Sequence, residues 1–339
     1  MDNDYSNSDC AAIMTPRKTL LLGWGEKQEY AHPPKNGEPA FFISDFFLTS
    51  PRPWVQFKHV KEWVPEFASS REGAKLDWQL PKKEDFMNSV QQAVFSIKKK
   101  LFEKVVPYAF ASAKHSISAD LRQNLLHSAW EHANKFRGFA YGFWLGNEGM
   151  VGASPEQLFI REGNSLSTLA CAGTVRTIEK ENTSKLEHEH QCVVDGIIQS
   201  LSDMGNVDKA ASYWRQAGNS LFHLVTPIQV SLNQNASYLE IAKRLHPTPA
   251  IGAYPKEKGA PWLAEFASHS PRWRYGAPIG YAWPDRQEEI AYVAIRNVQW
   301  NQDLWRLYAG CGVVESSNPE EEWNEWYSKF STIRNVTNV

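Results

Sequence analysis

The sequence predicts an α+β protein whose strands form largely antiparallel sheets. From residue 139 onward, strand-like segments follow one another directly, with Gly146-Asn147 and Gly163-Asn164 as turns between them. Strict alternation of strand and helix, which would favour a parallel sheet, is absent. Helices are marked separately, by apolar residues at three- and four-residue steps and by clear start signals on the last one.

The first 110 residues contain one clear helix signal and two strand signals. Residues 1–80 are rich in Pro and Trp, and their apolar stretch 41–48 fits a strand pair or an edge strand. A strand is expected over 104–110, where Pro107 fits an edge or a bulge. A helix starting at Glu84 precedes it, because apolar residues recur there with helical spacing at Phe86, Val90, Val94, Ile97 and Leu101.

The rest of the chain is expected to alternate between short strand runs and single helices. Two helices are predicted, over about 119–135 and about 184–201. Beyond the strand series that opens with 139–145, three late strands are predicted near 279–283, 289–297 and 304–314.

Composition and charge exclude several classes of protein. The 339 residues carry a net charge of −2, which gives no global attraction to nucleic acid or to an anionic membrane. No apolar stretch approaches the roughly 18 residues of a membrane helix, and the N-terminus lacks a signal segment. We therefore expect a cytoplasmic protein. Cys10, Cys171, Cys192 and Cys311 lack CxxC spacing, which argues against a disulfide framework or a structural zinc site.

The last helix offers a candidate metal site. Asn318 is a good N-cap, Pro319 suits the first helical position and Glu321 occupies the capping-box position. Glu322, Glu325 and Lys329 follow at three- and four-residue steps and therefore share one face. Two carboxylates on one face suit Mg²⁺, which prefers oxygen ligands. A solvated acidic face with an i,i+4 ion pair is the alternative.

Three other segments could contribute to a site. Glu189 lies at the mouth of an apolar helical face, where a metal ligand or an edge salt bridge would fit, whereas His188 and His190 point apart and lack a zinc-protease pattern. Glu156 lies beside a Pro turn, where burial could raise its pKa and make it a general acid. The segment Ala172-Gly173-Thr174 could bind a carboxylate, and the rigid loop at His246 could fix an imidazole.

Taken in order, these motifs resemble the chorismate-utilising enzyme family, which comprises isochorismate and salicylate synthases and the large subunits of anthranilate and aminodeoxychorismate synthases. The ordered motifs are Gly-Ala-Ser-Pro-Glu, Ala-Gly-Thr-x-Arg, Lys-x-x-x-Glu-His, Leu-His-Pro-Thr-Pro-Ala, Ala-Ile-Arg, Tyr-Ala-Gly-x-Gly-Val-Val and Ser-x-Pro-Glu-x-Glu-Trp-x-Glu-x-x-x-Lys. The resemblance covers about residues 84–333, the expected catalytic core. It implies one α+β domain with large antiparallel sheets sandwiched by helices, with residues 1–80 as its loop-rich, strand-containing N-terminal portion.

The resemblance also implies roles for individual residues. Glu189, Glu322 and Glu325 would surround the Mg²⁺ that holds the ring carboxylate of chorismate. Glu156 would protonate the departing C4 hydroxyl, His246 would lie against the ring, and Lys104 would activate water for attack at C2. Substrate binding would fall to Gly173, Thr174, Tyr275, Arg296, Tyr308, Gly310 and Lys329.

Two departures from the family pattern bear on these roles. After Lys-Val-Val the water-adding members continue Leu-Ala-Arg, but this chain has Pro107-Tyr108-Ala109. The family's Tyr-x-Gly-Pro reads Tyr275-Gly276-Ala277-Pro278 here. The first departure bears most on the role of Lys104. Because Lys104, Glu156 and the three proposed Mg²⁺ ligands are all present, we expect an isochorismate synthase, and we expect it to act as a monomer. Three alternatives stay open: a salicylate synthase, an ammonia-using subunit with a glutaminase partner, and a catalytically silent chorismate-binding protein.

Overall fold

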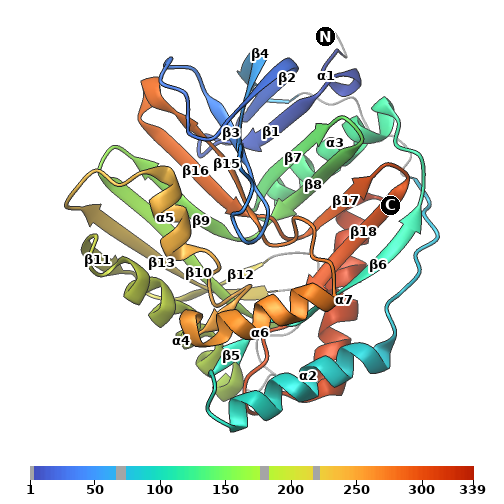
Figure 1. The fold of residues 1–339 in the computed structure, drawn as a ribbon, viewed down its shortest axis with the longest axis vertical. Coiled ribbons are helices and arrows are strands. Elements are labelled where there is room, and N and C mark those ends of the chain that lie inside the picture. The colour runs from blue at the N-terminus through green and yellow to red at the C-terminus, as the bar shows by residue number, and fades with distance from the viewer. Residues whose placement is uncertain (1–3, 66–73, 176–182, 217–221) are drawn as a thin grey trace.

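The computed structural model describes residues 4–65, 74–175, 183–216 and 222–339, and its strands dominate the fold (Figure 1). In chain order the strands are β1 (Cys10–Met14), β2 (Leu20–Tyr30), β3 (Ala40–Ile43), β4 (Trp54–Trp63), β5 (Lys104–Val105), β6 (Tyr108–Lys114), β7 (Phe139–Leu145), β8 (Glu148–Ser154), β9 (Gln157–Glu162), β10 (Ser165–Val175), β11 (Gly205–Lys209), β12 (Tyr213–Gln216), β13 (Phe222–Leu232), β14 (Ala253–Tyr254), β15 (Pro278–Trp283), β16 (Glu288–Val293), β17 (Asn297–Asn301) and β18 (Leu304–Gly310).

Seven α-helices and one 3₁₀ turn lie in the described part of the chain. They are α1 (Asp4–Asn7), α2 (Lys83–Lys98), α3 (Ala119–Lys135), α4 (Thr183–Leu201), α5 (Tyr238–Leu245), α6 (Lys256–His269), η1 (Pro284–Arg286) and α7 (Pro319–Thr337). Helix α4 packs on β10, α3 packs on β7 and β8, and α7 packs on β18 and against α2. The bounds of α3 match the predicted 119–135, and Ser118 caps it by accepting a hydrogen bond from Leu121 N.

The strands form one large antiparallel sheet, which confirms the predicted fold class. Its order is β11-β13-β10-β9-β16-β15-β3-β4-β2-β1-β7-β8-β17-β18-β6, and β12 pairs with β13 to make sixteen strands. Strands β5 and β14 pair separately. We call the β11-to-β15 half the β10 arm and the β7-to-β6 half the β18 arm; β1–β4 lie between them (Figure 1).

The N-terminal residues contribute the middle of the sheet. Strand β3 pairs with β15 of the β10 arm, and β1 pairs with β7 of the β18 arm. The expectation of a strand pair or edge strand over 41–48 is wrong, because β3 ends at Ile43 and is paired on both sides. Asp45 ends the strand: its carboxylate accepts hydrogen bonds from the backbone of Phe47 and Thr49, which folds the chain into a turn.

Three further strands differ from the predicted ranges, two by an internal break and one at its end. The strand expected over 104–110 is split, because Pro107 has no N–H to donate; β6 beyond it is the edge strand that Pro107 suggested. The strand expected over 289–297 is interrupted at 294–296, where Arg296 adopts a left-handed φ of 56°. Strand β18 ends at Gly310 rather than 314 because the chain crosses to pair Val313 with Val105.

Aromatic residues fill much of the interior. Trp54, Trp144, Trp300, Trp305 and Trp326 are all fully buried. Phe86, Val90 and Ile97 of α2 are buried as expected, but Leu101 is 54% exposed because α2 ends before it. Among the described residues, no helix combines the length and the apolar character needed to cross a membrane.

Candidate active site

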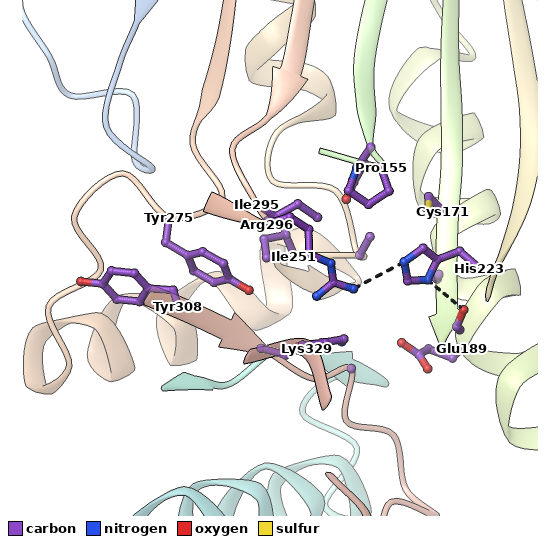
Figure 2. A pocket seen from close by; sticks show the side chains of 16 residues that line it. Pro155, Cys171, Glu189, His223, Ile251, Tyr275, Ile295, Arg296, Tyr308 and Lys329 are labelled. Atoms are coloured by element: carbon purple, nitrogen blue, oxygen red, sulfur yellow. Dashed lines mark hydrogen bonds between the residues drawn. The ribbon is translucent and has the colours of Figure 1, made fainter. Parts of the chain in front are cut away.

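A cavity of about 60 Å³ opens where the two arms of the sheet approach each other (Figure 2). The β10 arm contributes Cys171 to Gly173 and His223, and the β18 arm contributes Tyr308 and Gly310. Residues far apart in strand order therefore share one cavity. The full lining is Pro155, Glu156, Cys171, Ala172, Gly173, Glu189, His223, Ala250, Ile251, Tyr275, Ile295, Arg296, Tyr308, Gly310, Gly312 and Lys329.

Glu156 supplies a buried acid to the cavity wall. It lies in the sharp connection between β8 and β9, where its N–H donates to Ser154 Oγ over 3.1 Å. The residue is 3% exposed, and burial raises the pKa of its carboxyl to about 7. Hydrogen bonding from Thr248 and the positive charges of Lys104 and Arg215 act in the opposite direction. Glu156 can therefore hold a proton near neutral pH and release it to a substrate.

Two consecutive residues of the loop after α5 hold Glu156 and Lys104. Thr248 Oγ1 donates to Glu156 Oε1 over 2.8 Å. Lys104 Nζ donates to the carbonyl of the next residue, Pro249, over 2.7 Å. The loop thus fixes an acid and an amine from distant parts of the chain relative to each other.

Lys104 lies at the cavity wall rather than in the lining itself. It is fully buried, and its ammonium lies 3.3 Å from Oε1 of Glu189, which does line the cavity. Gly312 lines the cavity and lies beside both of these side chains. A Cβ added at Gly312 would meet Glu189 Oε1 at 2.0 Å and Lys104 Cε at 2.9 Å, so only glycine allows this packing.

The three proposed Mg²⁺ ligands each face a lysine. Glu322 accepts from Lys185 over 2.7 Å, Glu325 pairs with Lys329 over 2.5 Å, and Glu189 pairs with Lys104. Ligand atoms of Glu322 and Glu325 lie within 4.8 Å of each other and of Cys311 Sγ. Glu189 is close enough to raise the pKa of Glu322 through its charge. Glu320 and Glu321, by contrast, are exposed, as their helical positions predicted.

The carboxylates of α7 fit a hard divalent cation. Glu322 is fully buried, and its Oε2 has no hydrogen-bond partner within the described part of the chain. Burial and the neighbouring Glu325 raise the pKa of Glu322 to about 7. A divalent cation would satisfy the orphaned oxygen and offset the like-charge repulsion, and Mg²⁺ takes oxygen ligands.

Two cationic side chains also line the cavity, Arg296 and Lys329. Arg296 is buried in the left-handed conformation that interrupts the strand run, and its Nη2 lies 3.5 Å from His223 Nε2. Its Nε has no hydrogen-bond partner among the described residues. Lys329 Nζ donates to Gly310 O over 2.8 Å. Two cations in one cavity suit a small anionic ligand.

Two stacked tyrosines form one side of the cavity (Figure 2). The rings of Tyr275 and Tyr308 lie 5.3 Å apart at 14°. Tyr275 directs its hydroxyl into the cavity, whereas Tyr308 donates its hydroxyl away from it to Pro271 O. After Tyr275 this chain has glycine and then alanine, where the family pattern places the glycine one position later. Gly276 has a φ of +77°, a conformation that glycine adopts without strain, so the glycine lies where the backbone needs it.

The loop that the resemblance predicts to bind a carboxylate lies only partly within the described residues. Gly173 lines the cavity with a φ of +75°, at an irregularity in the pairing of β10 with β13. The backbone of Thr174 lies opposite His223 in that register. The side chain of Thr174 lies outside the described residues, so its predicted role stays a prediction.

His246 lies away from the cavity lining. It caps α5, and its Nε2 lies 2.6 Å from the carbonyl of Phe46, whose ring packs edge-on against it. Burial lowers the pKa of His246 to about 3, so the ring is neutral and Nε2 carries the proton. This location does not bring His246 to the open space, and it suits a residue that anchors the loop of Thr248.

Several residues that the structure brings to the site were not predicted from the sequence. Lys185 and Gly312 lie inside motifs that were recognised, so their spacing could have indicated them. Thr248 likewise lies in the rigid loop. His223 follows no motif, and only the pairing of β10 with β13 brings it to Gly173, whose carbonyl lies 3.4 Å from its Nδ1.

Comparison with known proteins identifies the family. The sequence profile described as "Chorismate binding enzyme" matches residues 40–338. Isochorismate synthase MenF of Bacillus subtilis is 31% identical over 286 residues, which are 80% of this chain and 59% of that protein. In structure, DhbC of Bacillus anthracis matches with a TM-score of 0.82 at 22% identity, over 98% of this chain and 97% of that one.

A further solved structure confirms the predicted architecture. Anthranilate synthase component I of Streptococcus pneumoniae matches with a TM-score of 0.70 at 14% identity, over 98% of this chain and 90% of that chain. The chain spans 59% of the length of its Bacillus subtilis relative. Because the profile match covers most of the sequence, the chain belongs to the chorismate binding enzyme family.

Proposed function

We propose that the protein converts chorismate to isochorismate. The observation that carries this proposal is the pair of groups held by Thr248 and Pro249: a buried carboxyl with a pKa of about 7 and a buried lysine amine. Moving a hydroxyl from C4 to C2 needs an acid at one position and a base at the other. Similarity to an isochorismate synthase at 31% identity adds support.

In the proposed reaction, Lys104 accepts one proton and Glu156 donates one, so atoms and protons balance. Water adds its oxygen to C2, and its proton passes to Lys104 as the base. The two ring double bonds shift from C1=C2 and C5=C6 to C1=C6 and C4=C5, and the C4 hydroxyl leaves as water with the proton of Glu156. One water enters and one leaves, so the reaction is an isomerisation.

Charged residues of the cavity would hold the substrate. Arg296 and Lys329 are suited to its anionic groups, and Tyr275 offers a hydroxyl. Glu189, Glu322 and Glu325 would hold Mg²⁺, which when bound supplies positive charge for the ring carboxylate. The lysines that face these carboxylates keep the site neutralised without the metal.

Product analysis tests the proposal directly. Purified protein with chorismate, Mg²⁺ and water as the nucleophile is expected to yield isochorismate. Salicylate with pyruvate would identify a salicylate synthase, and no product under any condition would identify a silent binding protein.

One observation favours a second candidate, an ammonia-using synthase. Residues 107–109 depart from the Leu-Ala-Arg of water-adding relatives, directly after Lys104 and Val105-Val106. The same assay with ammonium salts separates the two reactions, because an aminated product that forms only with ammonia would replace the isomerisation.

The pH profile is expected to depend on Glu156 and Thr248. The acid acts only when protonated, so kcat should fall as the pH rises through about 7, the raised pKa of Glu156. Thr248 stabilises the ionised form by its hydrogen bond. Thr248→Val should therefore raise this pKa and move the alkaline limb to higher pH, as measured by pH–rate profiles.

Thr168→Val is the matched control for Thr248→Val. Thr168 is also buried, but it lies outside the cavity lining, and its Oγ1 has no hydrogen-bond partner in the described part of the chain. Its profile should match that of the wild type. An unmoved limb in Thr248→Val would disprove the link between Thr248 and the acid.

Metal dependence is expected to rest on three carboxylates. Substitution of Glu189, Glu322 or Glu325 by Gln should abolish Mg²⁺-dependent turnover and weaken Mg²⁺ binding in calorimetry, while circular dichroism stays native. Glu321→Gln is the control, because Glu321 is an exposed acid on the same helix. Full activity in excess EDTA would contradict the metal role.

A further inference from the structure

Three potential ligands for a second metal ion lie together outside the cavity. Glu103, His188 and Cys192 each offer one ligand atom, and these atoms lie within 4.8 Å of one another. Glu103 immediately precedes β5, whereas His188 and Cys192 lie on α4. The three residues therefore come from two segments about 85 residues apart along the chain, in a cluster that only the fold creates.

The spacing of the three groups resembles that of ligands around one ion. His188 and Cys192 are four residues apart on a helix and therefore neighbours on one face. His188 Nε2 lies 3.9 Å from Cys192 Sγ. Two such ligands of a tetrahedral zinc ion lie about 3.6 Å apart, given Zn–N and Zn–S bonds of about 2.1 and 2.3 Å. Glu103 is anchored, because its N–H donates to Tyr254 O over 2.7 Å.

We propose that Glu103, His188 and Cys192 form a binding site for a zinc-class divalent cation. A thiolate and an imidazole are ligands that Mg²⁺ avoids and that Zn²⁺ or Co²⁺ prefers. Three protein ligands leave a fourth position open to water. The site differs in chemistry from the all-oxygen set of Glu189, Glu322 and Glu325, so the two sites select different ions.

The cluster is accessible from the surface. Glu103 and His188 are exposed and line a surface cavity of about 410 Å³, while Cys192 lies behind them at 3% exposure. Burial raises the pKa of the Cys192 thiol to about 11, against the effect of Lys104, so an incoming ion would displace its proton. The charges of Glu103, Asp195 and Glu189 also act on this thiol, and Lys100 and Lys258 line the same surface cavity, so the cluster has neighbours of both signs.

The proposed site lies directly behind the active site. Glu103 precedes Lys104, and His188 precedes Glu189, so the segments that supply the ion pair at the cavity wall also supply two ligands on the outside. An ion here would fasten α4 to β5 immediately behind that pair. The proposal does not depend on which reaction the cavity performs.

Cobalt titration tests the site with a spectroscopic readout. The protein is saturated with Mg²⁺ to fill the oxygen site and then titrated with Co²⁺. One Co²⁺ per chain should bind, with the near-ultraviolet charge-transfer band of a cobalt-bound thiolate. Cys192→Ser should lose this band. His188→Gln, an exposed substitution that leaves the core intact, should weaken binding roughly 100-fold or more, since even outer-shell partners contribute 10–100-fold.

Two controls distinguish this site from its neighbours. Cys311 also lies within 4.8 Å of two carboxylates, so Cys311→Ser must retain the band. His269→Gln removes an exposed histidine on another helix and should leave the titration unchanged. A band that persists in Cys192→Ser, that disappears in Cys311→Ser, or that never forms in the wild type would overturn the proposal.

Discussion

Glu156→Gln is expected to lower kcat by about 10²- to 10⁴-fold while chorismate still binds. Glutamine keeps the size of the side chain and can still accept the hydrogen bond of Thr248, but it has no acidic proton to give to the leaving hydroxyl. The substitution also removes no charge from a carboxyl that is largely protonated below its pKa of about 7. Steady-state kinetics should therefore show the loss in kcat, and fluorescence or calorimetry should show nearly unchanged chorismate binding.

Glu289→Gln provides a stringent control for this experiment. Burial raises the pKa of Glu289 to about 7 as well, so it shares the electrostatic character of Glu156. It pairs with Arg161 over 3.0 Å and does not line the cavity. Turnover should survive in Glu289→Gln. Near-normal turnover in Glu156→Gln would show that another group protonates the leaving hydroxyl.

Features with local physical causes could be predicted from the sequence. Helix α7 begins where Asn318 was expected to cap it, with the Asn318 side chain accepting hydrogen bonds from Glu320 N and Glu321 N. The shared face of Glu322 and Glu325 followed from helical spacing, and their ligand atoms do lie within 4.8 Å. Capping and periodicity are set by neighbouring residues, so one segment contains all the information.

Features that depend on distant pairing could not be predicted in this way. Strands β1 to β4 occupy the centre of the sheet, but nothing in residues 1–80 indicates their partners. The left-handed turn at Arg296 interrupts a segment whose composition favours a continuous strand. A side chain's position is equally non-local: His246 lies in a recognised motif, yet its contact is the carbonyl of Phe46, 200 residues away.

Two lysine–glutamate pairs of the candidate metal site differ in whether the sequence could predict them. Lys185 and Lys329 each lie within a recognised motif, and each faces a carboxylate from the proposed ligand set. Spacing along α7 predicted the Glu325–Lys329 pair as an i,i+4 neighbour. The Lys185–Glu322 pair joins α4 to α7 across 137 residues, so only the folded chain reveals it.

Lys104→Ala is expected to remove water-dependent isochorismate formation, again by about 10²- to 10⁴-fold, because no amine would then accept the proton of the attacking water. Chorismate binding should remain largely intact, since Lys104 does not line the cavity. The wild-type lysine is fully buried, held by Pro249 O and Glu189, so the substitution leaves a space of the size of its side chain. Isochorismate formation is measured by chromatography, and the fold by circular dichroism.

Chemical rescue separates a proton-accepting role of Lys104 from a merely structural one. A small primary alkylamine can enter the space left in Lys104→Ala and should restore part of the isochorismate formation. Lys104→Met fills that space without an amine, so it should be equally inactive and should resist rescue. The identity of the product decides what the added amine does: isochorismate indicates a base, and an aminated ring indicates a nucleophile. Unchanged activity in Lys104→Ala, or a wild type that prefers ammonia to water, would assign the chain to the ammonia-using synthases. That assignment would also explain why Pro107-Tyr108-Ala109 replaces the Leu-Ala-Arg of the water-adding relatives.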